Sequence, residues 1–250
     1  MGELDGRVLI VSGAGSGIGR AVAVLAADRG ASVVCVDREK ASETVAEIRA
    51  EDGVASAAEM DVRDEAAWAK AVSDANSEFG PVTLLCNVAG VTASDTVDEV
   101  TQQTIEGWHR IIDINLMGTW LGMKAVLPGM VAAGGGRIVN TSSVAGLRGL
   151  VGVFAYSASK GGVDAITRQV ASQFGGQNVL VNSVAPGVID TPLLAGNSEE
   201  MNRDFIPKLP TGRMGEPSEV AGLVCHLLGP LGGYISGQTI PVDAGWTARI

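Results

Sequence analysis

The chain has 250 residues, of which 46% are hydrophobic and 18% charged, a composition typical of one globular domain with a large buried core. Its formal net charge is −10 and its Lys and Arg residues form no cluster, which argues against nucleic acid and against tight docking of a strongly acidic carrier protein. No apolar stretch reaches the roughly 18 residues of a membrane-spanning helix, and the N-terminus lacks a signal-peptide pattern. We therefore expect a single domain over 1–250, cytoplasmic and without membrane contact.

Strand-like and helix-like patterns alternate along this domain. Buried strands are predicted at 8–11, 33–36, 82–86, 138–140 and 179–184, with weaker ones at 56–60 and 238–242. Amphipathic helices are predicted at 17–29, 40–52, 65–79, 104–132 and 155–174. The alternation predicts an α/β fold: one doubly wound, mostly parallel, seven-stranded sheet with helices on both faces. Such a sheet binds its ligand at the carboxyl ends of the strands.

A glycine-rich turn follows the first predicted strand. Glycines stand at every second position, as Gly13, Gly15, Gly17 and Gly19, before the first helix. The spacing is Gly-x-x-x-Gly-x-Gly and not G-x-G-x-x-G. Glycines allow a tight turn, and backbone amides at a helix N-terminus bind phosphate, so the turn predicts a pyrophosphate site.

The second predicted strand ends in an acidic residue, Asp37, followed by Arg38. A carboxylate at this point accepts hydrogen bonds from the hydroxyls of an adenosine ribose. The same carboxylate repels a ribose 2′-phosphate, which favours NAD over NADP. Arg38 is the opposing signal, because an arginine just past the strand can bind that phosphate.

The most informative pair is Tyr156 and Lys160, which are four residues apart in a predicted helix and therefore lie on one face. A neighbouring ammonium favours the phenolate, so we expect Lys160 to lower the pKa of Tyr156 and make it an acid–base group at a carbon–oxygen bond. Two hydroxyl residues, Ser142 and Ser143, end the strand that precedes this helix. Either could face Tyr156, but alternation along the strand means that they point in different directions.

The glycine turn, the strand-end serine and the Tyr-x-x-x-Lys pair together resemble the short-chain dehydrogenase/reductase family. The resemblance covers essentially the whole chain and implies a Rossmann fold. Further motifs follow in the family's order: Asn87-Val88-Ala89-Gly90, which has valine for the family's second asparagine, Asn115, and Pro186-Gly187 with Thr191.

The resemblance implies four catalytic residues. Tyr156 would be the acid–base group and Lys160 would bind the nicotinamide ribose. Ser143, preferred over Ser142 by family spacing, would hydrogen-bond the substrate oxygen. Asn115 would hold a water against Lys160 and so complete a proton relay to solvent.

The resemblance also implies a bound NAD, with Asp61 at the adenine amine and no metal. The implied cofactor residues are Gly13, Ser16, Gly17, Ile18, Gly19, Asp37, Asp61, Val62, Asn87, Ala89, Gly90, Tyr156, Lys160, Pro186, Gly187, Val188, Ile189 and Thr191. Ser16 stands where NADP-dependent relatives often carry a basic residue, which again favours NAD.

The implied activity is NAD(H)-dependent interconversion of a secondary alcohol and a ketone. Ser143, Ala145, Leu150 and Tyr156 would contact the substrate, and the apolar residues nearby favour an alicyclic or steroid-like compound. A polar, proline-punctuated segment at about 191–215 resembles the family's substrate lid. The alternatives are a 3-oxoacyl-thioester reductase and a catalytically silent protein that senses dinucleotides. The family further implies a homotetramer.

Overall fold

The computed structural model describes residues 2–92, 98–197 and 206–249. Seven parallel strands form one sheet in the order β3-β2-β1-β4-β5-β6-β7. The predicted fold class is therefore confirmed. The strands are β1 (Val8–Ser12), β2 (Ser32–Asp37), β3 (Ala55–Glu59), β4 (Val82–Asn87), β5 (Gly136–Thr141), β6 (Val179–Pro186) and β7 (Thr239–Val242).

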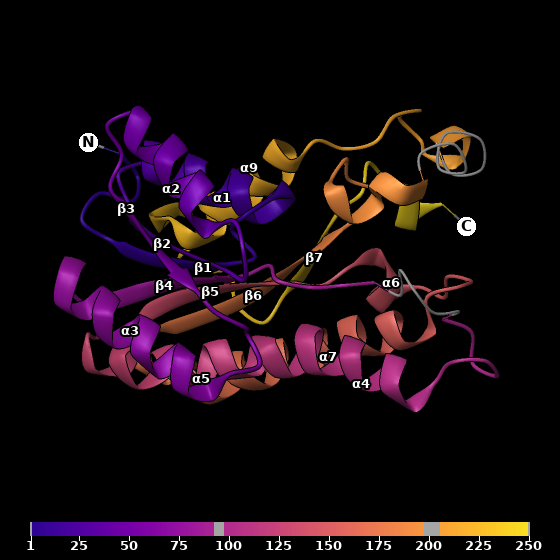
Figure 1. Ribbon diagram of the computed structural model, residues 1–250, viewed down its shortest axis with the longest axis horizontal. Helices are drawn as coiled ribbons and strands as arrows, with labels where there is room; N and C mark the ends of the chain where they lie inside the picture. The colour runs from indigo at the N-terminus through magenta and orange to yellow at the C-terminus, as the bar shows by residue number, and fades with distance from the viewer. Residues whose placement is uncertain (1, 93–97, 198–205, 250) are drawn as a thin grey trace.

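Helices cover both faces of the sheet (Figure 1). One face carries α1 (Gly17–Asp28), α2 (Ala41–Ala50) and α9 (Pro217–Leu228). The other face carries α3 (Glu65–Phe79), α4 (Ile105–Ile112), α5 (Gly118–Ala132) and α7 (Phe154–Phe174). A short helix, α6 (Val144–Leu147), follows β5 at the carboxyl end of the strands.

The central strand β1 is almost wholly apolar because helices bury both of its faces. All five residues of β1 are buried, and successive side chains enter opposite layers. Leu9 and Val11 belong to the core beneath α1 and α9, whereas Val8 and Ile10 belong to the core on the other face. This explains why the first strand reads as an unbroken apolar run.

The strand order reverses at β1, which pairs with β2 on one side and with β4 on the other. The chain leaves β1 toward β2 and β3, then returns across the sheet to β4. The loops after β1 and β4 therefore diverge and leave a crevice at their carboxyl ends. This is the ligand position that the doubly wound reading predicts.

The helix predicted over 104–132 is divided in the structure. A π-helical turn, η1 (Asp113–Met117), separates α4 from α5. Such single-turn widenings of a helix are frequent at functional sites. The π-helical turn η1 contains Asn115, which is fully buried.

The predicted lid falls partly outside the described residues, since 198–205 are not among them. The described parts contain the 3-10 turns η3 (Pro192–Asn197) and η5 (Ile206–Lys208). No helix in the described part of the chain has the length and apolar composition needed to cross a membrane.

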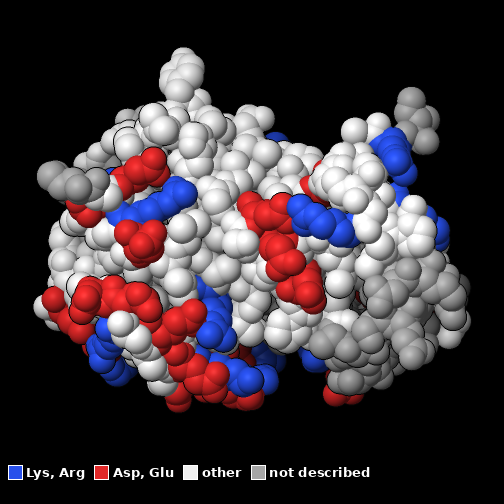
Figure 2. All heavy atoms as spheres, turned by 90° about the horizontal axis from the view of Figure 1, so that it is seen from above, with Lys and Arg blue, Asp and Glu red and all other residues white. Residues whose placement is uncertain are grey.

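The face formed by α1, α2 and α9 carries charges of both signs, with acidic and basic side chains lying side by side (Figure 2). An ion pair joins Arg20 on α1 to Glu47 on α2 at 2.6 Å. A second ion pair joins Arg213 to Glu219 on α9 at 2.8 Å. Exposed pairs of this kind contribute little to the free energy of unfolding.

Candidate active site

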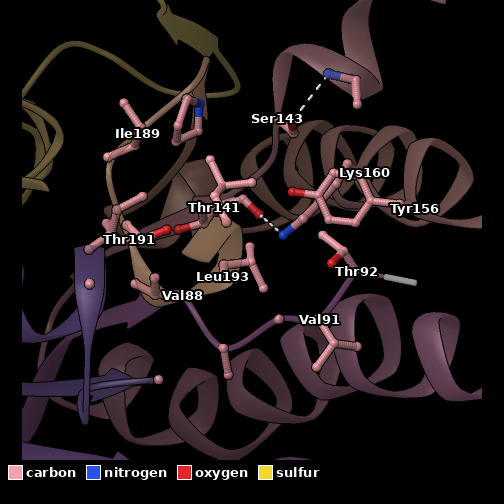
Figure 3. Close-up of a pocket in the computed structure, with 18 of the residues that line it drawn as sticks. Val88, Val91, Thr92, Thr141, Ser143, Tyr156, Lys160, Ile189, Thr191 and Leu193 are labelled. Atoms are coloured by element: carbon pink, nitrogen blue, oxygen red, sulfur yellow. Dashed lines mark hydrogen bonds between the residues drawn. The ribbon is translucent and has the colours of Figure 1, made fainter. Parts of the chain in front are cut away.

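A cavity of about 650 Å³ opens at the carboxyl ends of the strands. It extends from the glycine turn to the first turn of α7, and Figure 3 shows the end that holds Tyr156 and Lys160. Most of the residues predicted for cofactor or substrate line it: Gly13, Ser16, Gly17, Ile18, Asp37, Asp61, Val62, Ala89, Gly90, Ser143, Ala145, Leu150, Tyr156, Lys160, Pro186, Gly187, Val188, Ile189 and Thr191.

Three predicted residues, Gly19, Asn87 and Asn115, lie behind the cavity wall and not on it. A Cβ atom at Gly19 would lie only 2.0 Å from the Gly13 carbonyl oxygen, so Gly19 allows α1 to pack on the turn itself. The Asn87 side chain donates 2.9 Å to Asn140 Oδ1 and is 3% exposed. Both residues support the wall of the site from inside the protein.

The glycine turn brings two walls of the cavity together. Gly13 has φ +70°, and a Cβ there would lie 2.7 Å from the Ala89 backbone nitrogen. Gly17 has φ +52°, and a Cβ there would lie 3.0 Å from the Thr191 methyl group. Helix α1 begins at Gly17 with no acidic residue in its first turn, so the positive end of its dipole is available to an anion.

Asp37 lies at the rim, where its carboxylate is held by backbone amides. Oδ2 accepts from the Gly15 amide at 2.9 Å, and Oδ1 accepts from the Arg38 amide at 2.7 Å. The Arg38 side chain is paired with Glu39 at 3.1 Å and largely exposed. The carboxylate is therefore fixed beside the glycine turn, with lone pairs left to accept ribose hydroxyls.

Asp61 is engaged with a neighbouring cation. The Arg63 guanidinium contacts both of its carboxylate oxygens, with the shortest contact at 2.6 Å. These hydrogen bonds hold the pKa of Asp61 below its usual value. The next residue, Val62, accepts a 2.9 Å hydrogen bond on its carbonyl from the indole of buried Trp68, which anchors this part of the rim.

Tyr156 and Lys160 extend from one side of α7 into the cavity (Figure 3). Lys160 is 3% exposed, and its Nζ atom donates 2.7 Å to the carbonyl of Thr141 at the end of β5. The same nitrogen lies 5.6 Å from the centroid of the Tyr156 ring. The helical spacing therefore brings the two side chains together as predicted.

The acid–base properties of this pair differ from the expectation in one respect. Burial lowers the pKa of Lys160 to about 8, although the charge of Asp164 opposes that shift. Burial raises the pKa of Tyr156, and a hydrogen bond with Ser143 acts in the opposite direction. The shift in the Tyr156 pKa is therefore opposite to the predicted one, because desolvation of the phenolate outweighs the effect of Ser143.

The two strand-end serines point in different directions. Ser143 lines the cavity beside Tyr156 and opposes the rise in its pKa, while the Ser143 oxygen accepts from the Ala145 amide at 3.2 Å. The hydroxyl of Ser142 instead donates 3.2 Å to the backbone carbonyl of Lys160. Ser143 is thus the serine that faces the tyrosine.

Asn115 uses its side-chain amide within the protein. Oδ1 accepts from the Val91 amide at 2.8 Å, and Nδ2 donates to the Val91 carbonyl at 3.0 Å and to Ser159 Oγ at 3.1 Å. A Cβ at Gly90 would lie 3.2 Å from Asn115 Oδ1 and 3.4 Å from Lys160 Nζ, so these groups flank Gly90. Both N–H groups of the side-chain amide are used within the protein, while Oδ1 keeps a lone pair for the water expected against Lys160.

The substrate side of the cavity is mostly apolar. Besides Ala145 and Leu150, it includes Val151, Val153, Leu193, Leu194 and Trp246. Trp246 and Thr92 were not predicted, because no sequence pattern links the residues after β7, or the position after the Asn-Val-Ala-Gly motif, to this pocket. The carbonyl of Thr141 was also missed, since a backbone group carries no signal in side-chain chemistry.

Comparisons with known proteins agree with this geometry. A family model described as enoyl-(acyl carrier protein) reductase matches residues 13–247. Cyclohexanol dehydrogenase of Acinetobacter sp. (strain SE19) is 38% identical over 249 residues, which cover 99% of this chain and 97% of that protein. The 3-oxoacyl-(acyl-carrier-protein) reductase of Thermotoga maritima is 34% identical over 245 residues, which cover 97% of this chain and 98% of that protein. The crystal structure of levodione reductase matches with a TM-score of 0.93 at 33% identity, covering 99% of this chain and 100% of that chain.

A doubly wound sheet with a glycine turn at its switch point, and a tyrosine, a lysine and a serine around one cavity, defines an oxidoreductase that uses a nicotinamide dinucleotide. The chain belongs to the short-chain dehydrogenase/reductase family, as its motifs predict.

Proposed function

We propose that this protein is an NAD(H)-dependent dehydrogenase that interconverts an alicyclic secondary alcohol and its ketone. The observation that carries the proposal is the position of Ser143, Tyr156 and Lys160 around one cavity whose substrate side is mostly apolar. A ring hydrocarbon with one reactive oxygen matches such a pocket, because few polar groups converge there. The relative that oxidises cyclohexanol supports the same substrate class.

The residues present fit NAD. The first turn of α1 offers backbone amides and an uncompensated dipole to a pyrophosphate, and Gly13 and Gly17 keep the approach to it free of side chains. Asp37 offers fixed carboxylate oxygens to the adenosine ribose and an unfavourable charge to a 2′-phosphate. Arg38 lies beside Glu39, whose carboxylate adds a second negative charge near this rim and weakens the opposing case for NADP.

When bound, the nicotinamide supplies the hydride acceptor for alcohol oxidation. The protein's own residues then handle the proton. Ser143 hydrogen-bonds the substrate oxygen and stabilises negative charge that develops on it. Tyr156, as phenolate, removes the hydroxyl proton, and in the reverse direction its phenol returns that proton to the carbonyl oxygen. The buried ammonium of Lys160 lies beside the ring and attracts the phenolate form.

A 3-oxoacyl-thioester reductase is the second candidate. It is favoured by the family model's description and by the Thermotoga relative. Its substrate would arrive on an acidic carrier protein, which the net charge of −10 on this chain would repel. The third candidate, a catalytically silent dinucleotide sensor, does not require Ser143, Tyr156 and Lys160 to meet in one cavity.

One experiment tests the proposal against both alternatives. Purified protein is assayed for NADH or NADPH formation with cyclohexanol and other alicyclic alcohols, steroids, polyols and 3-hydroxyacyl thioesters. We expect turnover of alicyclic alcohols with NAD, and loss of turnover in Tyr156→Phe with NAD binding retained in calorimetry. Activity on thioesters alone with NADP would support the second candidate. Binding of NAD with no turnover of any compound would support the third.

We also propose that the protein is a cytoplasmic homotetramer. Its cysteines Cys35, Cys86 and Cys225 are buried free thiols, which suits a reducing compartment. Exposed apolar side chains lie at the start of α4 and on α5, at Ile105 and Trp120. Sedimentation equilibrium distinguishes a tetramer from a monomer of 25.5 kDa.

A further inference from the structure

Asp98 is a buried carboxylate that lies far from α7 in sequence and at its first turn in space. It is 3% exposed and precedes α4 in the segment between β4 and that helix. Its oxygens accept from the Ala155 amide at 2.7 Å and from the Tyr156 amide at 3.2 Å. Its own carbonyl accepts from the Phe154 amide at 3.0 Å.

Three consecutive backbone amides at the start of α7 therefore donate hydrogen bonds to one residue, Asp98. A helix begins with four amides that have no partner within the helix, and a side chain close in sequence usually accepts one of them. The residue at that position here, Val153, makes no side-chain cap. Asp98 accepts these hydrogen bonds instead, although it lies 57 residues before Ala155 in the chain.

The charge of Asp98 is well accommodated at this position. The positive end of the α7 dipole faces it, and the hydrogen bonds from Ala155 and Tyr156 are charge-assisted. A third donor, the Gln103 side-chain amide, lies 2.9 Å from Oδ1 and fixes the carboxylate from its own segment. A residue held by three donors has little freedom to move.

Tyr156 is held on its carbonyl side as well. The Ser159 hydroxyl donates 2.7 Å to the Tyr156 carbonyl, and Asn115 donates to Ser159 while it binds Val91 through both backbone groups. The segment after β4 is thus connected to Tyr156 twice: through Val91, by way of Asn115 in η1 and Ser159, and directly through Asp98. The amide and the carbonyl of Tyr156 are both fixed from that segment.

We propose that Asp98 is a positioning residue for the oxidoreductase reaction: it fixes the first turn of α7 so that the Tyr156 phenol stays within reach of the substrate oxygen. This inference rests on the proposed role of Tyr156 as the acid–base group. Catalytic geometry is sensitive to displacements of about 1 Å, so a loosened first turn lowers kcat more than it lowers cofactor binding. The NAD site at Asp37 and the glycine turn does not depend on this cap.

The test compares Asp98→Ala and Asp98→Asn with Asp64→Ala. Asp64 is a matched control, because its side chain caps α3 by accepting from the Ala67 amide at 3.0 Å, away from the cavity. We expect Asp98→Ala to lower kcat at least 30-fold with KM for NAD changed less than threefold. Asp98→Asn retains one acceptor oxygen and should fall between it and the wild type. Asp64→Ala should lose stability while keeping kcat within twofold.

The proposal is overturned if Asp98→Ala loses stability like Asp64→Ala and keeps the wild-type kcat. If Asp98→Ala does not fold, Asp98→Asn decides the matter by the same split between kcat and KM. Hydrogen exchange of the first turn of α7 reports the cap independently of turnover. Faster exchange in Asp98→Asn with unchanged kcat contradicts a positioning role, whereas full activity in Tyr156→Phe contradicts the proposed function itself.

Discussion

The Nζ atom of Lys160 donates a 2.7 Å hydrogen bond to the carbonyl of Thr141, and this bond joins the middle of α7 to the carboxyl end of β5. Ser143 follows two residues after Thr141, lines the same cavity as Tyr156 and opposes the rise in the Tyr156 pKa. The strand end therefore holds Lys160 directly and places Ser143 beside the tyrosine. Because β5 is buried in the sheet, it holds the side chains of the site in fixed positions.

Replacing Lys160 by Met should change how stability depends on pH. The pKa of Lys160 is lowered to about 8 in the native protein, whereas a lysine in the unfolded chain has its ordinary pKa of 10.5. Between these values the unfolded state binds more protons, so the free energy of unfolding of the wild type rises with pH relative to Lys160→Met. The full rise is about 3 kcal/mol.

Urea unfolding of both proteins from pH 7 to pH 10 measures this difference. Lys70→Met serves as the control, because the Lys70 side chain is 77% exposed. A difference between wild type and Lys160→Met that stays flat over this range contradicts the burial argument.

Replacing Gly19 by Ala should destabilise the protein and abolish dinucleotide binding. The new methyl group would lie 2.0 Å from the Gly13 carbonyl oxygen, and backbone on both sides prevents an easy adjustment. The cost is about 2 kcal/mol or more. Gly222→Ala on α9 is the matched control, since its methyl group would meet no described neighbour within 4 Å.

The control should become more stable by about 0.5–1 kcal/mol, because alanine reduces the freedom of the unfolded chain. Thermal unfolding and NADH fluorescence titration follow both variants. Retained NADH binding in Gly19→Ala would show that the turn tolerates a wider separation from α1.

Replacing Asp37 by Asn should shift cofactor preference toward NADP. The amide oxygen retains one acceptor for the Gly15 amide, while the charge that repels a 2′-phosphate is removed. We expect kcat/KM with NAD to fall about tenfold and the ratio of NADP to NAD activity to rise, from the loss of about 1.4 kcal/mol in charge-assisted bonding. Asp74→Asn on α3 is a remote control, and an unchanged ratio in Asp37→Asn would reject the assignment of Asp37 to the ribose.

Replacing Leu150 by Asn should weaken alicyclic substrates selectively. An amide without partners in an apolar wall costs about 1–3 kcal/mol when the substrate covers it. That range corresponds to a loss of roughly 5- to 150-fold in kcat/KM for cyclohexanol, with KM for NAD unchanged. Val54→Asn, on a half-exposed residue outside the cavity, is the control. An unaltered kcat/KM in Leu150→Asn would show that the substrate does not contact this wall.

The strand and helix pattern could be predicted from the sequence because each buried strand carries its own apolar run and each helix its own period. The division of 104–132 by the π-helical turn η1 could not be, since the widening is a change in backbone hydrogen bonding that residue type does not report. The meeting of Tyr156 with Lys160 followed from helical spacing alone. The direction in which the Tyr156 pKa shifts could not be predicted from spacing, because it depends on how deeply the folded protein buries the phenol.

The local motifs of the site could thus be predicted from the sequence, because each of them lies within a few residues of chain. They are the glycine turn, the acidic end of the second strand and the Tyr-x-x-x-Lys pair. Only the tertiary structure decided that Ser143 faces the tyrosine and Ser142 does not. It likewise decided that the Asn115 side-chain amide hydrogen-bonds the Val91 backbone and that Asp98 caps α7. The physical reason is separation along the chain. Short-range spacing determines which side chains share a turn or a face. The partner of a buried polar group depends instead on how elements tens of residues apart in the chain pack together.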